Sequence, residues 1–129
     1  MTRRAYSTPD APKPVAAYSV GMEAAGLVFT AGQGGHDPET GELPDGIEAQ
    51  TRQALRNVDA ILRAANSSLA SAVKVSIFLA DRADYAAMNE VYREYMPDDP
   101  PVRTTVQAGL GLRMLVEIDA IAVAENPSN

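Results

Sequence analysis

Residues 115–123 read LVEIDAIAV, and their apolar and polar side chains alternate as they do along a β-strand. One side of this strand is wholly apolar and is expected to face helices: it carries Val116, Ile118, Ala120 and Ala122. The other side mixes two acids with three apolar side chains, namely Leu115, Glu117, Asp119, Ile121 and Val123. A sheet face open to water is usually more polar than this. We therefore expect the second face to form a contact between subunits that also carries a polar site.

Two helices are expected before this strand. The clearer one begins near Asp45, which has capping-box spacing to Glu48. Its apolar face is made of Ile47, Leu55, Val58, Ile61, Leu62 and Ala65. The second begins at Asp81 or Asp84 and ends at Pro97. Its apolar stripe contains Tyr85, Met88, Val91, Tyr92 and Tyr95.

Further strands are expected at residues 18–22, 27–31, 73–79 and 102–106, which gives the order β-β-α-β-α-β-β. Right-handed crossovers would place both helices on one face of the sheet. The length fits a single α+β domain over residues 1–129. Its proline-rich residues 1–16 should form an extended arm, with a short strand near residues 4–7. Residues 32–41 are dense in turn formers and should be a loop.

Composition excludes several classes of protein. The chain has no cysteine and one histidine, so it offers neither thiolate zinc sites nor a multi-histidine metal site. Its net charge of −6 argues against a nucleic-acid partner. There is no apolar run of about 20 residues and no apolar segment typical of a signal peptide. We expect a cytoplasmic protein with no membrane partner and no cofactor.

Two side chains could carry chemistry, and each has a plainer alternative. Arg103 shares a strand face with Thr105 and is either a solvated arginine or a fork that binds a carboxylate. Glu117 lies between apolar neighbours and is either an exposed strand glutamate or a partly dry carboxylate that transfers protons. Asp119 is a rival for the second role. No Ser-His-Asp set can be assembled.

The segments together resemble the Rid/YjgF family of reactive-intermediate deaminases, also catalogued as the endoribonuclease L-PSP family. The resemblance runs from about Tyr18 to Val123. It rests on Tyr18-Ser19, residues 27–33, 37–41, 47–53 and 73–79, Asn89-Glu90-Val91-Tyr92, Arg103-Thr104-Thr105-Val106 and residues 116–122. Each segment is weak alone, but their order and spacing are specific to the superfamily.

The resemblance implies a chorismate-mutase-like fold and a homotrimer with sites at the subunit interfaces. It also implies that Arg103 binds the carboxylate of a 2-imino acid and that Glu117 helps to activate water. Tyr18, Gly32, Asn89 and Thr105 are the substrate-binding residues that it suggests. The expected reaction is hydrolysis of 2-imino or 2-enamino acids to 2-keto acids and ammonia, without a metal.

Departures from the family pattern gather around the expected pocket and leave the substrate open. Gly34-Gly35 replaces the common Ile-Pro, Thr105 stands where cysteine is frequent, and Leu110-Gly111 replaces Leu-Pro. Three alternatives follow: cyclisation or condensation of a different imine, binding of a small ligand without turnover, and cleavage of RNA. The acidic charge argues against the last.

Overall fold

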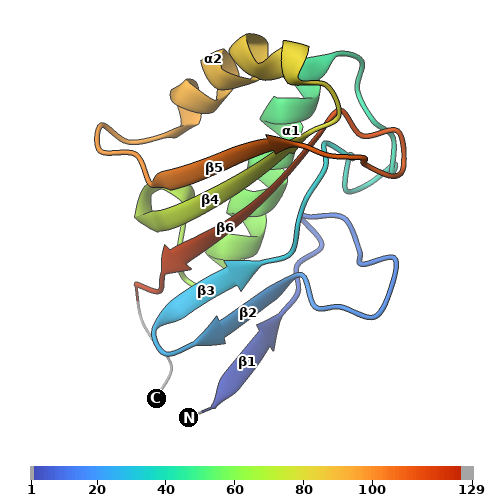
Figure 1. Ribbon diagram of the computed structural model, residues 1–129. Coiled ribbons are helices and arrows are strands. Elements are labelled where there is room, and N and C mark those ends of the chain that lie inside the picture. The colour runs from blue at the N-terminus through green and yellow to red at the C-terminus, as the bar shows by residue number, and fades with distance from the viewer. Residues whose placement is uncertain (1, 126–129) are drawn as a thin grey trace.

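Residues 2–125 are described by the computed structural model, and six strands among them form one mixed sheet in the order β1-β2-β3-β6-β4-β5 (Figure 1). Strands β4 and β5 are parallel, and the other neighbours are antiparallel. The strands are β1 Arg3–Tyr6, β2 Gly21–Ala24, β3 Leu27–Thr30, β4 Ala72–Leu79, β5 Val102–Gln107 and β6 Val116–Val123. The strand expected to decide the fold, β6, therefore lies inside the sheet.

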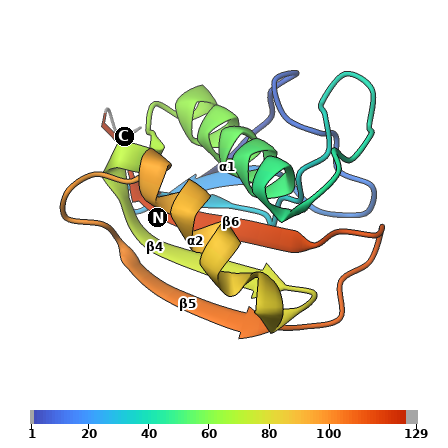
Figure 2. The same cartoon turned by 90° about the horizontal axis from the view of Figure 1, so that it is seen from above.

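Two α-helices, α1 Ile47–Ala64 and α2 Tyr85–Tyr95, lie on the same face of the sheet (Figure 2). Each follows one strand and leads into another, α1 from β3 to β4 and α2 from β4 to β5. The right-handed crossover rule predicted this common face. Short 3-10 turns, η1 Leu69–Ser71 and η2 Arg82–Asp84, precede β4 and α2.

The core fills the space between the helices and the sheet. The four apolar residues of β6 that were expected to face the helices are at most 1% exposed: Val116, Ile118, Ala120 and Ala122. The predicted apolar face of α1 is buried along its whole length. In α2, Met88, Val91 and Tyr92 are buried, whereas Tyr85 is 44% exposed. The apolar periodicity therefore located the core correctly on α1 and β6, and on α2 except at its first residue, Tyr85.

Local predictions at element ends were less accurate. The strand expected at residues 18–22 is β2, which begins at Gly21, so Tyr18 belongs to the segment before it. The capping box at Asp45 does not form, because Gly46 occupies the N-cap position with a φ of 90°, which favours glycine. Val73 is 42% exposed because the β4–β6 register shifts between Ala72 and Lys74.

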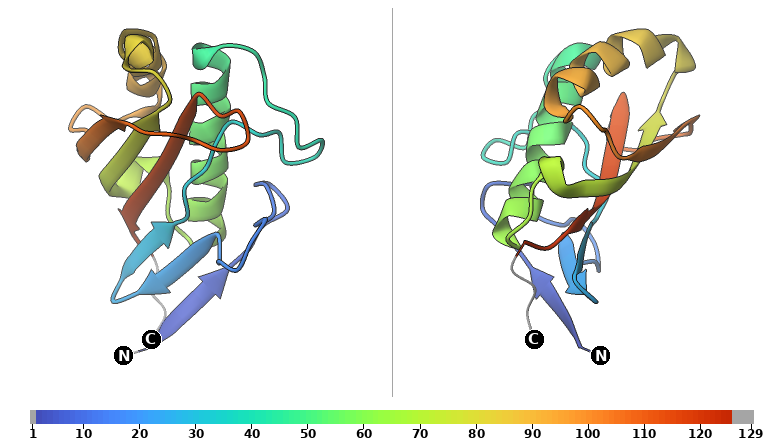
Figure 3. Two further views of the ribbon diagram at one scale, coloured as in Figure 1. Left: turned by 45° about the vertical axis from the view of Figure 1, so that its right-hand side comes forward. Right: turned by 90° about the vertical axis from the view of Figure 1, so that its left-hand side faces the viewer.

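The opposite face of the sheet is not covered by either helix (Figure 3). Several large apolar side chains on it are more than a third exposed: Phe29, Val102, Val106 and Val123. The carboxylates of Glu117 and Asp119 lie on the same face, as the alternation of β6 requires. No helix within residues 2–125 is long and apolar enough to cross a membrane.

Candidate functional site

The first cluster forms where β6 meets the loop that follows β3. Gln33 pairs with Ile118 through two backbone hydrogen bonds of 2.8 and 2.9 Å, which extends the sheet by one bridge. This pairing brings Gly32 against the side chain of Glu117. A β-carbon on Gly32 would lie 2.9 Å from the carboxyl carbon of Glu117. The carboxylate therefore rests on a bare backbone that only glycine provides.

The carboxyl group of Glu117 is partly buried and lies near a second acid, Asp119. Burial and the negative charge of Asp119 raise its pKa above the ordinary value. The pKa of Asp119 is also raised by burial, but a hydrogen bond from Ser76 and the charge of Lys74 oppose that shift. Ser76 lies directly across from Asp119 on β4. Asp119 is thus held by the sheet, while Glu117 faces a cavity.

That cavity has a volume of about 730 Å³, within the range of small-molecule sites. One wall comes from the N-terminal arm and includes Tyr18, which is 45% exposed. The loop with Gly32 and His36 and the side chains of Met114 and Glu117 form the rest. Burial lowers the pKa of His36, which favours the neutral form of this imidazole.

The loop beside Glu117 is fixed to α1 by two buried polar side chains that sequence reasoning missed. Asn57 donates hydrogen bonds of 3.0 and 2.9 Å to the carbonyls of Gly34 and His36. Gln50 donates to the Pro44 carbonyl and accepts from the backbone N–H of Leu115. The available signal was their spacing of seven residues, which places both on the apolar face of α1.

The second cluster surrounds Arg103 on β5. Its guanidinium donates a 2.8 Å hydrogen bond to Asn89 Oδ1 and a short one to the Tyr85 hydroxyl. It also lies over the ring of Tyr92, 4.8 Å from the ring centre. The two tyrosines were predicted only as members of an apolar stripe. A cavity of about 400 Å³ borders this cluster and is lined by Asn89, Tyr92 and Arg103.

One chain does not bring Arg103 and Glu117 together. Arg103 is the register partner of Val75, which is buried under the helices, whereas Glu117 is the partner of Phe78 on the uncovered face. Thr105 points to the helix side like Arg103, and its hydroxyl is buried without a hydrogen-bond partner among residues 2–125. The predicted site residues thus form two clusters: Arg103, Asn89 and Thr105 on one face, and Tyr18, Gly32 and Glu117 around the larger cavity.

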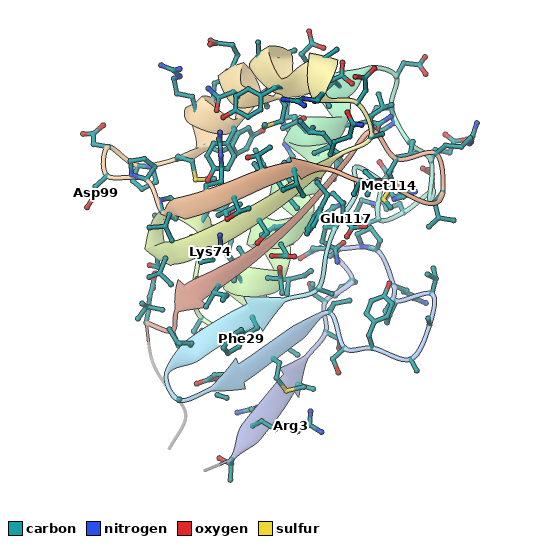
Figure 4. The ribbon with its side chains drawn as sticks, in the orientation of Figure 1. Arg3, Phe29, Lys74, Asp99, Met114 and Glu117 are labelled. Atoms are coloured by element: carbon teal, nitrogen blue, oxygen red, sulfur yellow. The ribbon has the colours of Figure 1, made fainter. Side chains whose placement is uncertain are left out.

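Figure 4 shows Glu117 and Met114 near each other at the start of β6, with Lys74 farther along the sheet. Among the described residues, no group of three or more histidine, cysteine or acidic side chains could hold a metal ion.

Comparison with known proteins places the chain in a family. The family model described as Endoribonuclease L-PSP matches residues 8–124. A RutC family protein from Pyrococcus horikoshii is 47% identical, over 92% of this chain and 95% of its own. A 2-iminobutanoate/2-iminopropanoate deaminase from Rattus norvegicus is 37% identical, over 95% and 91%. The crystal structure of E. coli TdcF with bound serine has a TM-score of 0.90 at 35% identity, over 95% and 99%. The chain therefore belongs to the Endoribonuclease L-PSP family, and several of its relatives are named 2-iminobutanoate/2-iminopropanoate deaminase.

Proposed function

We propose that this protein hydrolyses 2-imino acids at a site shared by two copies of the chain. The observation that carries the proposal is the separation of the two clusters on opposite faces of one sheet. One cluster offers an oriented guanidinium, and the other a carboxylate of raised pKa in a cavity. A complete site forms when the Arg103 cluster of one copy meets the Glu117 cavity of the next.

The Arg103 cluster suits a substrate carboxylate. A guanidinium has five N–H donors, of which Asn89 and Tyr85 take one each within residues 2–125. The remaining donors can form the two parallel bonds that a carboxylate accepts. The ring of Tyr92 holds the plane of the Arg103 guanidinium, so the arginine side chain loses less conformational entropy when it binds a carboxylate.

The Glu117 cavity suits addition of water to an imine. Water adds to C2 as a proton passes to the imine nitrogen, which gives a carbinolamine. Glu117 accepts a proton from the water and returns one to the nitrogen. Collapse of the carbinolamine then yields the 2-keto acid and ammonia. A pKa raised toward the working pH makes Glu117 a better proton-transfer group. The imine carbon is already electrophilic, so the reaction requires no cofactor.

The assembly that we propose is a homotrimer formed through the uncovered sheet face. Exposed apolar side chains such as Phe29 and Val123 would be buried there. In a closed ring of identical contacts, every copy presents its Arg103 cluster to one neighbour and its Glu117 cavity to the other. Each trimer then holds complete sites. The lack of cysteine is compatible with the reducing cytoplasm, which we propose as the location, although one relative is named chloroplastic.

Names of relatives support the reaction class. The relative from Rattus norvegicus is named for deamination of 2-iminobutanoate and 2-iminopropanoate. The E. coli TdcF structure holds serine, a 2-amino acid with the same carboxylate as the proposed substrate.

The direct test is acceleration of imine hydrolysis. An L-amino acid oxidase generates the imino acid in situ, and trapping by semicarbazide reports how much imine remains. We expect the wild-type protein to consume the imine, Glu117→Gln to lower kcat by roughly 100-fold or more, and the exposed Glu48→Gln to match wild type. Binding without acceleration would indicate a ligand-binding module. A cyclised or condensed product would indicate a different imine reaction, and cleavage of RNA by the wild type alone would favour a nuclease.

A further inference from the structure

The loop after β3 has a second bare position two residues beyond Gly32. A β-carbon on Gly34 would lie 2.9 Å from Cγ of Met114 and 3.2 Å from Nδ1 of His36. Met114 therefore packs its thioether directly on the backbone of Gly34, and both residues line the larger cavity. A side chain at position 34 would displace the methionine.

The two bare positions place Met114 next to the reacting carboxylate. Gln33 is paired with Ile118 in a β-bridge, so Gly32 and Gly34 flank an extended residue and turn the same side to the cavity. Extended backbone separates them by about 7 Å. Glu117 covers the first position and Met114 the second, which agrees with the neighbouring labels in Figure 4.

We propose that Met114 determines which imino acid the site accepts, by contacting the substrate's own side chain. This inference rests on the proposed hydrolysis. With C2 held at Glu117, a contact of about 4 Å with the thioether is reached by a side chain of roughly two to four carbons. A methionine side chain is flexible and polarisable, so it fits an unbranched aliphatic chain well.

Charge around the cavity supports an apolar substrate side chain. Asp37, Glu39 and Glu117 line the cavity, and Lys13 is the opposing cation there. His36 does little to offset these acids, because burial lowers its pKa and favours the neutral imidazole. A second carboxylate on the substrate would meet an excess of negative charge.

The test compares imines derived from norvaline and from alanine, both generated by an amino acid oxidase. The readout is kcat/KM for the norvaline-derived imine divided by kcat/KM for the alanine-derived imine. General losses of activity cancel in this ratio. Met114→Gln keeps the length of the side chain but makes its end polar, and we expect it to lower this ratio by about 4- to 15-fold. Met114→Leu should preserve the ratio to within about twofold. Met22→Gln, a methionine on β2 outside the cavity, is the matched control.

A second pair of variants tests the contact with Gly34. Gly34→Ala pushes the methionine away and should also lower the ratio, whereas the same change in a Met114→Ala background should alter it by less than about twofold. An unchanged ratio in Met114→Gln would overturn the inference while leaving hydrolysis intact. So would faster turnover of the glutamate-derived imine than of the norvaline-derived one. If the wild-type protein accelerates no imine at all, both proposals are wrong.

Discussion

A guanidinium that lies over a tyrosine ring and donates to an asparagine has little freedom to turn. Arg103 is held in this way by Tyr92 and Asn89, both from α2. Glu117 is placed differently, since its carboxylate rests on Gly32 and depends on the absence of a side chain there. At the scale of single residues, the Arg103 guanidinium is oriented by aromatic packing, whereas the Glu117 carboxylate is placed by the absence of a β-carbon at Gly32.

Replacement of Arg103 tests the carboxylate fork. Arg103→Lys should be almost as defective as Arg103→Ala, because an ammonium reproduces neither the two parallel bonds nor the planar contact with Tyr92. Loss of a charge-assisted bond should reduce kcat/KM by roughly 10- to 150-fold. Steady-state kinetics on one imino acid, with both variants confirmed as folded, gives the answer. Normal turnover by Arg103→Ala would mean that another group binds the carboxylate.

The pH dependence of kcat/KM tests the role of Glu117. Its pKa is raised, so the ionised form that accepts a proton is lost as pH falls through a value above the ordinary one of 4.5. Asp119→Asn removes one cause of the raised pKa, and the acidic limb of the profile should therefore move to lower pH. Glu48→Gln, on the exposed side of α1, should leave the limb in place. Loss of activity in Asp119→Asn without a shifted limb would instead make Asp119 the proton-transfer group.

At the scale of elements, α1 supports the site through its buried face. Its apolar residues pack on the sheet, and Asn57 on the same face holds the carbonyls of the loop that carries Gly32. The loop also passes so close to the helix that a β-carbon on Gly35 would lie 2.6 Å from the Gln50 carbonyl oxygen. The departure from the family pattern at Gly35 is thus a packing requirement.

Gly35→Ala tests this close approach. The clash is with helix backbone, which cannot move aside, so we expect a loss of about 1–3 kcal/mol in the free energy of unfolding. Gly109→Ala is the matched control, since a β-carbon there meets nothing within 4 Å and the change should stay within about 0.5 kcal/mol. Urea unfolding at one protein concentration measures both. Equal stabilities would show that the loop can withdraw from α1.

Helices and strands could be predicted from the sequence where a single hydrophobic periodicity determined them. The alternation of β6 and the apolar face of α1 predicted buried residues correctly, because burial on one side is a local repeat. The start of α1 was not predicted correctly, since Gly46 rather than Asp45 occupies the N-cap position. Val73 was misplaced by a bulge that only pairing with β6 creates. Alternation showed that Arg103 and Thr105 share a face, but only packing against α2 shows which face that is.

The whole molecule presents one helix-covered face and one uncovered face of the same sheet (Figure 3). The uncovered face carries apolar side chains at its ends and a polar row of Lys74, Ser76 and Asp119 across its middle. Such a surface fits association with further copies of the chain better than exposure to water.

Association of the wild-type chain is expected to give a trimer at micromolar concentration. Ile121→Glu places a charge on the uncovered face in every copy and should shift the protein toward monomers. Ala86→Glu, on the exposed side of α2, should leave the assembly unchanged. Sedimentation velocity distinguishes the species. A wild-type protein that is a stable monomer would contradict both the trimer and the shared site.

Mixing of two inactive variants tests the shared site most directly. Arg103→Ala and Glu117→Gln, each confirmed as poorly active alone, are co-expressed with different tags, and mixed oligomers are purified through both tags. If Arg103 and Glu117 act from different copies, every mixed trimer regains both side chains at one of its sites, which is about a third of the sites in the purified oligomers. Imine hydrolysis should then rise from the level of either variant to about a third of the wild-type rate. If mixed oligomers stay as inactive as the single variants, the two side chains act within one copy or not at all, and the account of a site shared between subunits is wrong.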